Sequence, residues 1–242
     1  MKRWILLLCC ILLALSVTGC TGESSSSGSS SEPSSSQTQL QEDPVDPETA
    51  AALELVAEAD CEAPDFLTEE QQTLYRKANT AYKQFALYTD GFGSTEWNPV
   101  TVEEYDNSFC VGNGSITTWK DYETAMLGLF TPDYLEELNL TVTELEDGTT
   151  LRYAHFADYQ GQLAYSDGAR GSNITYLGPD TFELISQTED EIRFYVIGTY
   201  QDYVENEAGE LVQEGEITQR KYEIVLTHTE NGWRFSKFAL TI

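Results

Sequence analysis

Two hydrophobic patterns divide the folded part of the chain at about residue 140. Before that point, apolar residues recur every three or four positions, which is the spacing of one face of a helix. The second stretch is the clearest, because Thr68 and Gln71 have the spacing of a capping box and Asp90-Gly91 follows the last apolar residues. The pattern predicts four helices, over residues 47–59, 68–88, 118–130 and 131–138.

After residue 140, apolar and polar residues alternate, which is typical of half-buried strands. Gln160-Gly161 predicts one hairpin, and Asn231-Gly232 predicts another with a type I′ turn. Helices followed by consecutive antiparallel strands predict an α+β domain, in which N-terminal helices pack on a curved antiparallel sheet of cystatin-like or NTF2-like architecture. The expected strands cover residues 151–159, 162–166, 182–186, 192–203, 217–229 and 233–240.

The first 19 residues have the three parts of a secretory signal. Lys2 and Arg3 form a basic start, residues 4–15 are almost purely apolar, and small residues follow. The apolar run is shorter than the roughly 20 residues that a membrane-spanning helix needs. The motif Val-Thr-Gly-Cys at residues 17–20 resembles a bacterial lipobox, so we expect cleavage before Cys20 and lipidation of that cysteine. The alternative is an ordinary secretory signal.

A serine-rich stretch follows and predicts a flexible tether over residues 20–49. It has almost no apolar side chains, so it cannot bury enough surface to offset the entropy cost of ordering. Such a chain of about 28 residues has an average reach of roughly 30 Å. We therefore expect one α+β domain over residues 50–242, held by the lipid on the extracytoplasmic face of a cell membrane.

The charge of the chain is strongly acidic, with 41 Asp and Glu against 13 Lys and Arg and a formal net charge of −28. Nucleic acid and anionic lipid are therefore poor partners. A basic protein surface is the natural electrostatic complement, because a field of this sign steers cationic surfaces. The alternative is that the charge serves only solubility outside the cell.

The predicted domain contains two cysteines, Cys61 and Cys110. A disulfide between them is possible in an extracytoplasmic protein. The alternative, which we favour, is a pair of independent buried thiols, because sequence alone does not bring their Cα atoms within bonding range.

The chain offers little catalytic chemistry. His155 and His228 are its two histidines, and Cys110 lies between apolar residues that raise a thiol pKa. No nucleophile elbow, phosphate-binding loop, dinucleotide fingerprint or zinc-protease motif occurs. The acidic residues are scattered without metal-ligand spacing, and a carboxylate acid–base pair placed by the fold remains an alternative. We predict a protein that is not an enzyme and uses no cofactor or metal.

The most unusual segment is a polar loop between two expected strands, over residues 159–176. It combines glycines with Asp167, Arg170, Ser172 and Asn173. Polar loops on a sheet scaffold often carry binding groups, so these four are the candidate binding residues. In the alternative interpretation, Arg170 pairs with a nearby Asp and the glycines only make turns.

Five features follow one another over about residues 65–242. They are a helix with Tyr82 and Phe85, a helical stretch over 122–138 with the step Phe130-Thr131, the hairpin Tyr159-x-Gly161-x-Leu163, the Gly/Ser loop 167–173, and the terminal Asn231-Gly232-Trp233-Arg234. This order resembles the secreted inhibitors of cell-wall DL-endopeptidases, the IseA type. The lipobox and the long tether depart from that family, whose type member is simply secreted.

The resemblance implies a non-catalytic protein that binds a wall endopeptidase of the papain-like Cys/His class and blocks its basic cleft with an acidic surface. It carries over no catalytic residue. The alternative is an NTF2-like domain that binds a small ligand or wall fragment, and a hydrolase is a more distant one. An enclosed apolar pocket inside the sheet would favour the ligand-binding domain. A solid core with an acidic, loop-rimmed groove would favour the inhibitor.

Overall fold

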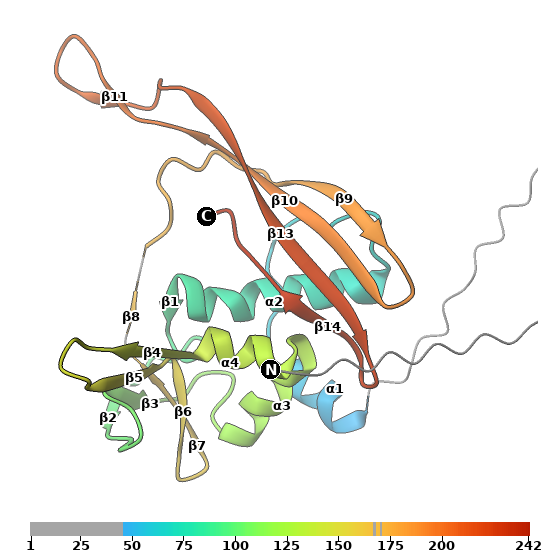
Figure 1. Ribbon diagram of the computed structural model, residues 1–242, viewed down its shortest axis with the longest axis vertical. Helices are drawn as coiled ribbons and strands as arrows, with labels where there is room; N and C mark the ends of the chain where they lie inside the picture. The colour runs from blue at the N-terminus through green and yellow to red at the C-terminus, as the bar shows by residue number, and fades with distance from the viewer. Residues whose placement is uncertain (1–45, 167, 170) are drawn as a thin grey trace, which may run out of the picture. The chain divides into compact units, whose positions relative to one another are not determined.

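Four helices and a set of antiparallel strands form the described part of the chain, so the predicted α+β class is confirmed (Figure 1). The structure, a computed structural model, describes residues 46–166, 168–169 and 171–242. The predicted signal, Cys20 and the tether up to residue 45 lie outside the described residues. No helix of the described part is long and apolar enough to cross a membrane. The helices are α1 (Pro47–Leu53), α2 (Glu69–Ala86), α3 (Trp119–Leu129) and α4 (Pro132–Asn139).

The start of α2 and the end of α1 are stabilised by different kinds of contact. Helix α2 starts with the predicted capping box: Thr68 Oγ1 accepts from the Gln71 N–H at 3.3 Å, and the Thr68 N–H donates to Gln71 Oε1 at 3.0 Å. Helix α1 is shorter than the predicted 47–59. At the end of α1, the Lys77 ammonium of α2 donates to the carbonyl of Leu53, the last helical residue, at 2.8 Å and to that of Val56 at 3.0 Å. A cation at these carbonyls is favourable, and it holds the chain where α1 has stopped.

The four long C-terminal strands form one antiparallel sheet in the order β14-β13-β10-β9, so the predicted meander is confirmed. Helix α2 runs along one side of this sheet (Figure 1). Tyr75 of α2 contacts the rings of four phenylalanines with centroids 5.5–6.4 Å apart, and these rings pack between helix and sheet: Phe182, Phe194, Phe235 and Phe238. The strands are β9 (Thr181–Gln187), β10 (Glu191–Gln201), β13 (Ile217–Thr229) and β14 (Gly232–Lys237).

The remaining strands are short and make smaller sheets. One has the order β2-β3-β7-β6, while β4 pairs with β5, β1 with β8 and β11 with β12. The expected single strand over 151–159 is wrong, because the chain bends at His155 and its two halves join different sheets. The strands are β1 (Tyr88–Thr89), β2 (Asn98–Val100), β3 (Phe109–Val111), β4 (Leu140–Glu144), β5 (Thr150–Ala154), β6 (Phe156–Tyr159), β7 (Gln162–Ser166), β8 (Gly168–Ala169), β11 (Val204–Glu205) and β12 (Leu211–Val212).

Both predicted hairpins form, but the type I′ turn is at the first one. Gln160 and Gly161 have φ values of 56° and 83°, the positive pair that this turn requires. In the second hairpin, Thr229 pairs with Gly232, whose φ is 91°, and Asn231 does not have a positive φ. A left-handed glycine directly after two loop residues is typical of a turn with a bulge. The type I′ turn predicted at Asn231-Gly232 is therefore wrong.

The two cysteines of the described part are not joined to each other. Cys61 lies in the segment between α1 and α2, and Cys110 lies in β3, where it pairs with Tyr165 of β7. Both side chains are half-buried. The possible Cys61–Cys110 disulfide is therefore absent from this structure.

Candidate functional site

The predicted loop joins two distinct features of the surface. At its start, Ser166 and Gly168 line a pocket. At its end, the Gln201 N–H donates to the Thr175 carbonyl at 2.8 Å, which ties the loop to the base of a long hairpin. The pocket and the hairpin are therefore the two places where this loop could bring a partner into contact.

The four candidate residues of this loop do not converge on one point in the described structure. Asp167 and Arg170 lie outside the described residues. Ser172 is exposed and does not line the pocket. Asn173 Oδ1 accepts from the Thr175 N–H at 3.0 Å and from the Thr175 hydroxyl at 2.8 Å. The amide oxygen of Asn173 thus stabilises a turn of the loop.

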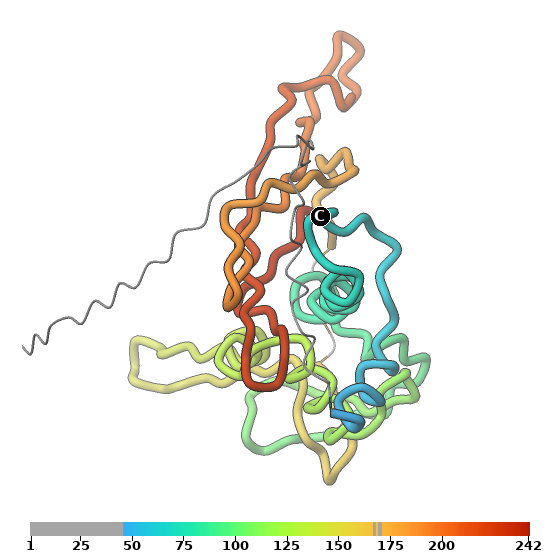
Figure 2. The backbone as a smooth tube through the Cα atoms, turned by 90° about the vertical axis from the view of Figure 1, so that its right-hand side faces the viewer, coloured from blue at the N-terminus to red at the C-terminus, as the bar shows by residue number. Residues whose placement is uncertain are grey.

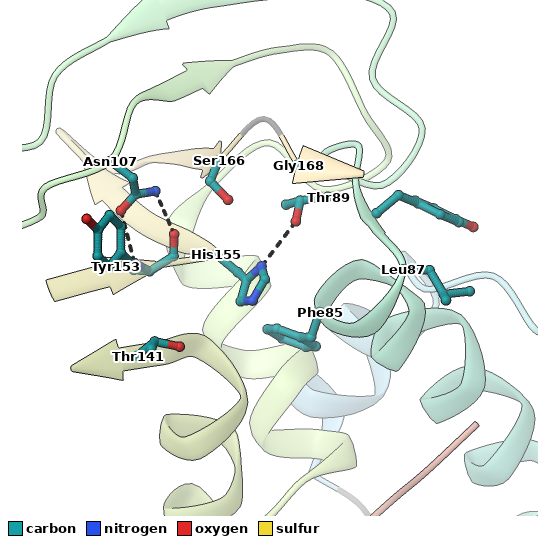
Figure 3. Close-up of a pocket in the computed structure, with 11 residues that line it drawn as sticks. Phe85, Leu87, Thr89, Asn107, Thr141, Tyr153, His155, Ser166 and Gly168 are labelled. Atoms are coloured by element: carbon teal, nitrogen blue, oxygen red, sulfur yellow. Dashed lines mark hydrogen bonds between the residues drawn. The ribbon is translucent and has the colours of Figure 1, made fainter. Parts of the chain in front are cut away.

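The pocket has a volume of about 320 Å³ and lies where α2 ends and several short strands meet (Figure 3). In this view the His155 ring lies near the middle, with Thr89 and Phe85 on one side and Thr141 and Tyr153 on the other. The eleven lining residues come from α2, from β1, β4, β5, β7 and β8, and from loops: Phe85, Leu87, Tyr88, Thr89, Asn107, Thr141, Tyr153, Ala154, His155, Ser166 and Gly168.

The backbone on each side of His155 is held by an asparagine side chain. Asn107 Nδ2 donates to the Ala154 carbonyl at 2.9 Å, and Asn107 Oδ1 accepts from the Ala154 N–H at 3.1 Å. In the same way, Asn139 Nδ2 donates to the Phe156 carbonyl at 3.0 Å, and Asn139 Oδ1 accepts from the Phe156 N–H at 2.8 Å. Each amide therefore replaces one residue of a partner strand, and together they fix the bend at which β5 ends and β6 begins.

The imidazole ring of His155 is held from two further directions. Phe85 meets it edge-on, with ring centroids 5.8 Å apart. The Thr89 hydroxyl lies 3.2 Å from His155 Nδ1 and 2.9 Å from the carbonyl of Gln84. A hydroxyl has one hydrogen, and the Gln84 carbonyl can only accept it, so Thr89 accepts from Nδ1. This contact places a proton on Nδ1 and fixes the ring orientation.

The described lining of the pocket differs in composition from the chain as a whole. None of its lining residues in the described part is Asp, Glu, Lys or Arg, although 41 residues of the chain are acidic. Its walls consist of aromatic rings, hydroxyl groups, one amide and one imidazole. These described groups offer a ligand apolar surface and hydrogen-bonding positions.

The second feature is a projecting acidic hairpin. The connection between β10 and β13 extends beyond the rest of the sheet and carries β11 and β12 (Figures 1 and 2). Residues 202–216 contain no Lys or Arg, and no cation of the described residues forms an ion pair with a carboxylate of this segment. Its six acidic residues are all exposed: Asp202, Glu205, Glu207, Glu210, Glu214 and Glu216.

Apolar side chains are exposed among these carboxylates. Leu211 is 72% exposed and Ile217 61% exposed, and Tyr203 and Val204 are also exposed. Internal hydrogen bonds order the tip: Asn206 Oδ1 accepts from the Glu210 N–H at 2.9 Å, and the Asn206 N–H donates to the Glu210 carbonyl at 2.9 Å. Exposed apolar groups surrounded by charge on an ordered element are typical of protein interaction surfaces.

Another hollow, of about 420 Å³, includes Cys61 and three carboxylates, Asp60, Glu62 and Asp180. Burial raises the pKa of Tyr176 to about 12, and its hydroxyl donates to Asp180 at 2.8 Å. Burial also raises the pKa of the Cys61 thiol, which is the opposite of the shift that activates a nucleophile. No group of three or more His, Cys, Asp or Glu is placed to hold a metal within the described part of the chain.

Sequence analysis missed both the pocket and the hairpin as sites. The hairpin had a visible signal, because fifteen consecutive residues, 202–216, include six carboxylates and no cation. The pocket had none, because its lining residues are spread from Phe85 to Gly168 and are common uncharged types.

No protein-family model and no curated protein sequence matches this chain. The resemblance to the endopeptidase inhibitors therefore stays a prediction that rests on the order of features in the sequence.

Proposed function

We propose that this protein is a non-catalytic lipoprotein on the extracytoplasmic face of the membrane, which binds and inhibits a peptidoglycan DL-endopeptidase. The observation that carries the proposal is the acidic hairpin: an ordered, projecting element with six exposed carboxylates and exposed Leu211 and Ile217. An inhibitor that blocks a cleft needs an element that projects from its own surface and matches the cleft in charge.

Charge gives this hairpin a preference for a basic partner. Complementary potentials raise the association rate and exclude partners of the same sign. The exposed apolar side chains add area that loses water on contact, at about 25 cal/mol per Å². Their positions among the carboxylates fit a partner whose basic surface includes an apolar groove.

The alternative NTF2-like domain gains little support from the sheet itself. Four phenylalanine rings surround Tyr75 in the space between α2 and the sheet, where such a domain would have its ligand pocket. The packed rings in this space agree with the inhibitor hypothesis. A ligand would have to bind elsewhere, for example in the pocket at His155.

The test measures peptidoglycan hydrolysis by a purified DL-endopeptidase of the papain-like Cys/His class, with and without the full chain in detergent. We expect inhibition that weakens as salt is raised, because exposed charges are screened over about 10 Å at 0.1 M ionic strength. The variant E205Q/E207Q/E210Q should lose about tenfold in inhibitory potency, taking about 0.5 kcal/mol for each exposed charge.

A matched control changes the same charge on another exposed hairpin. The variant E144Q/E146Q/D147N neutralises three carboxylates at the tip of β4 and β5, and it should inhibit like the unmodified protein. Equal loss in both variants would show that only net charge matters and would remove the hairpin from the proposal. No binding to any wall endopeptidase at low salt would refute inhibition. Release of wall peptides by the protein alone would refute a non-catalytic role.

A further inference from the structure

The two edges of the C-terminal sheet differ in how they are covered. At β14, the Thr131 N–H donates to the Phe235 carbonyl at 3.0 Å, and Arg234 Nε donates to the Leu127 carbonyl at 2.7 Å. The connection between α3 and α4 therefore lies against this strand. At the opposite edge, β9 pairs with β10 and with no other strand of the described residues (Figure 1).

We infer that β9 is a docking edge for an extended segment of a partner protein, in which apolar and cationic side chains alternate. Such a segment adds a strand to the sheet. Main-chain hydrogen bonds provide affinity in this kind of recognition, and alternate side chains provide specificity. The inference does not rest on the proposed inhibition, because β9 lies outside the acidic hairpin of residues 202–216.

Apolar side chains of β9 are exposed at this edge. Leu184 is 41% exposed and Ile185 is 44% exposed. Leu184 pairs with Phe194 and Ser186 pairs with the adjacent Arg193, so Ile185 is the extra residue of a bulge. A bulge limits pairing at an edge. The added strand therefore pairs with the part of β9 before the bulge, and Ile185 is its last contact.

β9 is held in its extended conformation from the core side. Phe182 of β9 packs against Tyr75 of α2 and Phe194 of β10, with ring centroids 5.8 Å and 6.4 Å apart. β10 in turn pairs with β13 along its whole length. The protein therefore loses little conformational entropy when a segment docks, which favours affinity.

The two faces of β9 carry different side chains. Glu183 pairs with Tyr195 and Leu184 pairs with Phe194, so Glu183 and Leu184 point to opposite faces of the sheet. An added strand has the same alternation. Its apolar side chains would lie beside Leu184, and its cationic side chains would lie beside Glu183.

The carboxylates around β9 favour cations in the docking segment, because opposite charges on neighbouring strands are stabilising. Glu183 already forms an ion pair with Lys221. Glu189 and Asp190, in the connection to β10, are exposed, so they attract a cation at the end of the added strand. Residues 171–192 contain no Lys or Arg and five acidic residues: Asp180, Glu183, Glu189, Asp190 and Glu191.

Charge also decides between a partner and other occupants of the edge. A second copy would bring together two chains of net charge −28 and two sets of the same carboxylates, and like charges on neighbouring strands are destabilising. The sequence of residues 20–45 contains four acidic residues and no Lys or Arg, so this part of the chain does not supply the cations either.

The test uses the full chain in detergent and three synthetic peptides. In the first, valine alternates with lysine and threonine; the second has glutamate in place of lysine. The third is the lysine peptide with methylated backbone nitrogens, which keeps its charge and removes its hydrogen-bond donors. Calorimetric titration should show the lysine peptide binding at least about tenfold more tightly than the other two. Hydrogen exchange should show new protection in residues 181–187.

Leu184→Lys and Ile185→Lys should each weaken binding of the lysine peptide by about tenfold, because a charge at a sheet edge opposes strand addition. The two variants change neighbouring but different positions, so a folding defect in one leaves the other as a test. Leu177→Lys is the matched control. Leu177 is 42% exposed and lies before β9, and its variant adds the same charge. It should bind like the unmodified protein.

Several results would overturn the inference. Equal binding of the methylated peptide would exclude strand addition, and equal weakening in Leu177→Lys would reduce the effect to net charge. Absence of binding, or binding without protection of residues 181–187, would remove β9 as the docking edge. A dimer of the full chain that Leu184→Lys dissociates would assign the edge to a second copy instead.

Discussion

Replacing the half-buried Asn139 with alanine should destabilise the protein more than the loss of one polar side chain usually does. The Asn139 amide makes two hydrogen bonds, at 3.0 Å and 2.8 Å, to the carbonyl and N–H of Phe156, which is fully buried. Alanine leaves both backbone groups without these partners. An unsatisfied buried polar group costs about 1–3 kcal/mol, so we expect Asn139→Ala to lower the free energy of unfolding by about 2–4 kcal/mol.

Urea unfolding, followed by far-UV circular dichroism and tryptophan fluorescence, measures this change. Asn98→Ala is the control, since Asn98 is exposed and makes one 3.4 Å bond to the Val111 carbonyl. It should cost at most about 0.5 kcal/mol, as most surface substitutions do. If Asn139→Ala also cost less than about 0.5 kcal/mol, the bend at His155 would not depend on this amide.

A double-mutant cycle extends the same test to Asn107. Asn107 and Asn139 hold the residues directly before and after His155. Once one of them is removed, the bend is free to relax, and the second loses part of its effect. We therefore expect the double variant to be less destabilised than the sum of the single variants, with a coupling of about 0.5–3 kcal/mol. Strict additivity would mean that the two asparagines act on independent parts of the backbone.

Three other predictions follow from single sites. Gly114→Ala should lower stability by about 2 kcal/mol or more in urea unfolding, because its new Cβ would lie 1.9 Å from a backbone carbonyl oxygen, whereas Gly168→Ala meets open space. The Cys61 thiol should react with iodoacetamide at pH 8 more slowly in the folded protein than in urea, as followed by peptide mass spectrometry, because burial raises its pKa and lowers the thiolate fraction. The pKa of Glu223 is lowered by hydrogen bonds, of which the one from Lys237 has the largest effect. This carboxylate therefore stabilises the fold at pH values above its pKa in the unfolded chain. The stabilisation is lost as the pH falls through its pKa in the folded protein. Glu223→Gln should therefore flatten the acid limb of the stability curve, and an unchanged limb would contradict this.

The parts of the fold that could be predicted are those set by neighbouring residues. The capping box of α2 needs only Thr68 and Gln71, and hydrophobic alternation in successive strands gives the order of β9, β10, β13 and β14. The end of α1 could not be predicted in the same way, because the ammonium that meets its last carbonyls comes from Lys77, 24 residues after Leu53.

The bend at His155 has the same kind of cause. Residues 151–159 have a continuous strand pattern, yet the backbone changes sheets because asparagines 47 and 17 residues away bond to Ala154 and Phe156. The strand propensity of residues 151–159 does not depend on such distant contacts, so it could not indicate the bend. The loop predicted as a binding segment does border the pocket, since Ser166 and Gly168 line it. The other lining groups come from elements that are far apart in the sequence and that only the fold brings together.

The two candidate sites rely on forces of different range, and this decides what each could bind. The carboxylates of the hairpin act through a field that extends about 10 Å at 0.1 M salt, so they favour the first encounter with a large basic partner. The described groups around His155 act only at hydrogen-bond and van der Waals distance, so they could affect a ligand only after contact. The loop from Ser166 to Thr175 connects the two. A ligand in the pocket would contact the first residues of a segment whose end is bonded to the hairpin base, and any coupling between the sites would have to pass through this short stretch or through the sheet behind it.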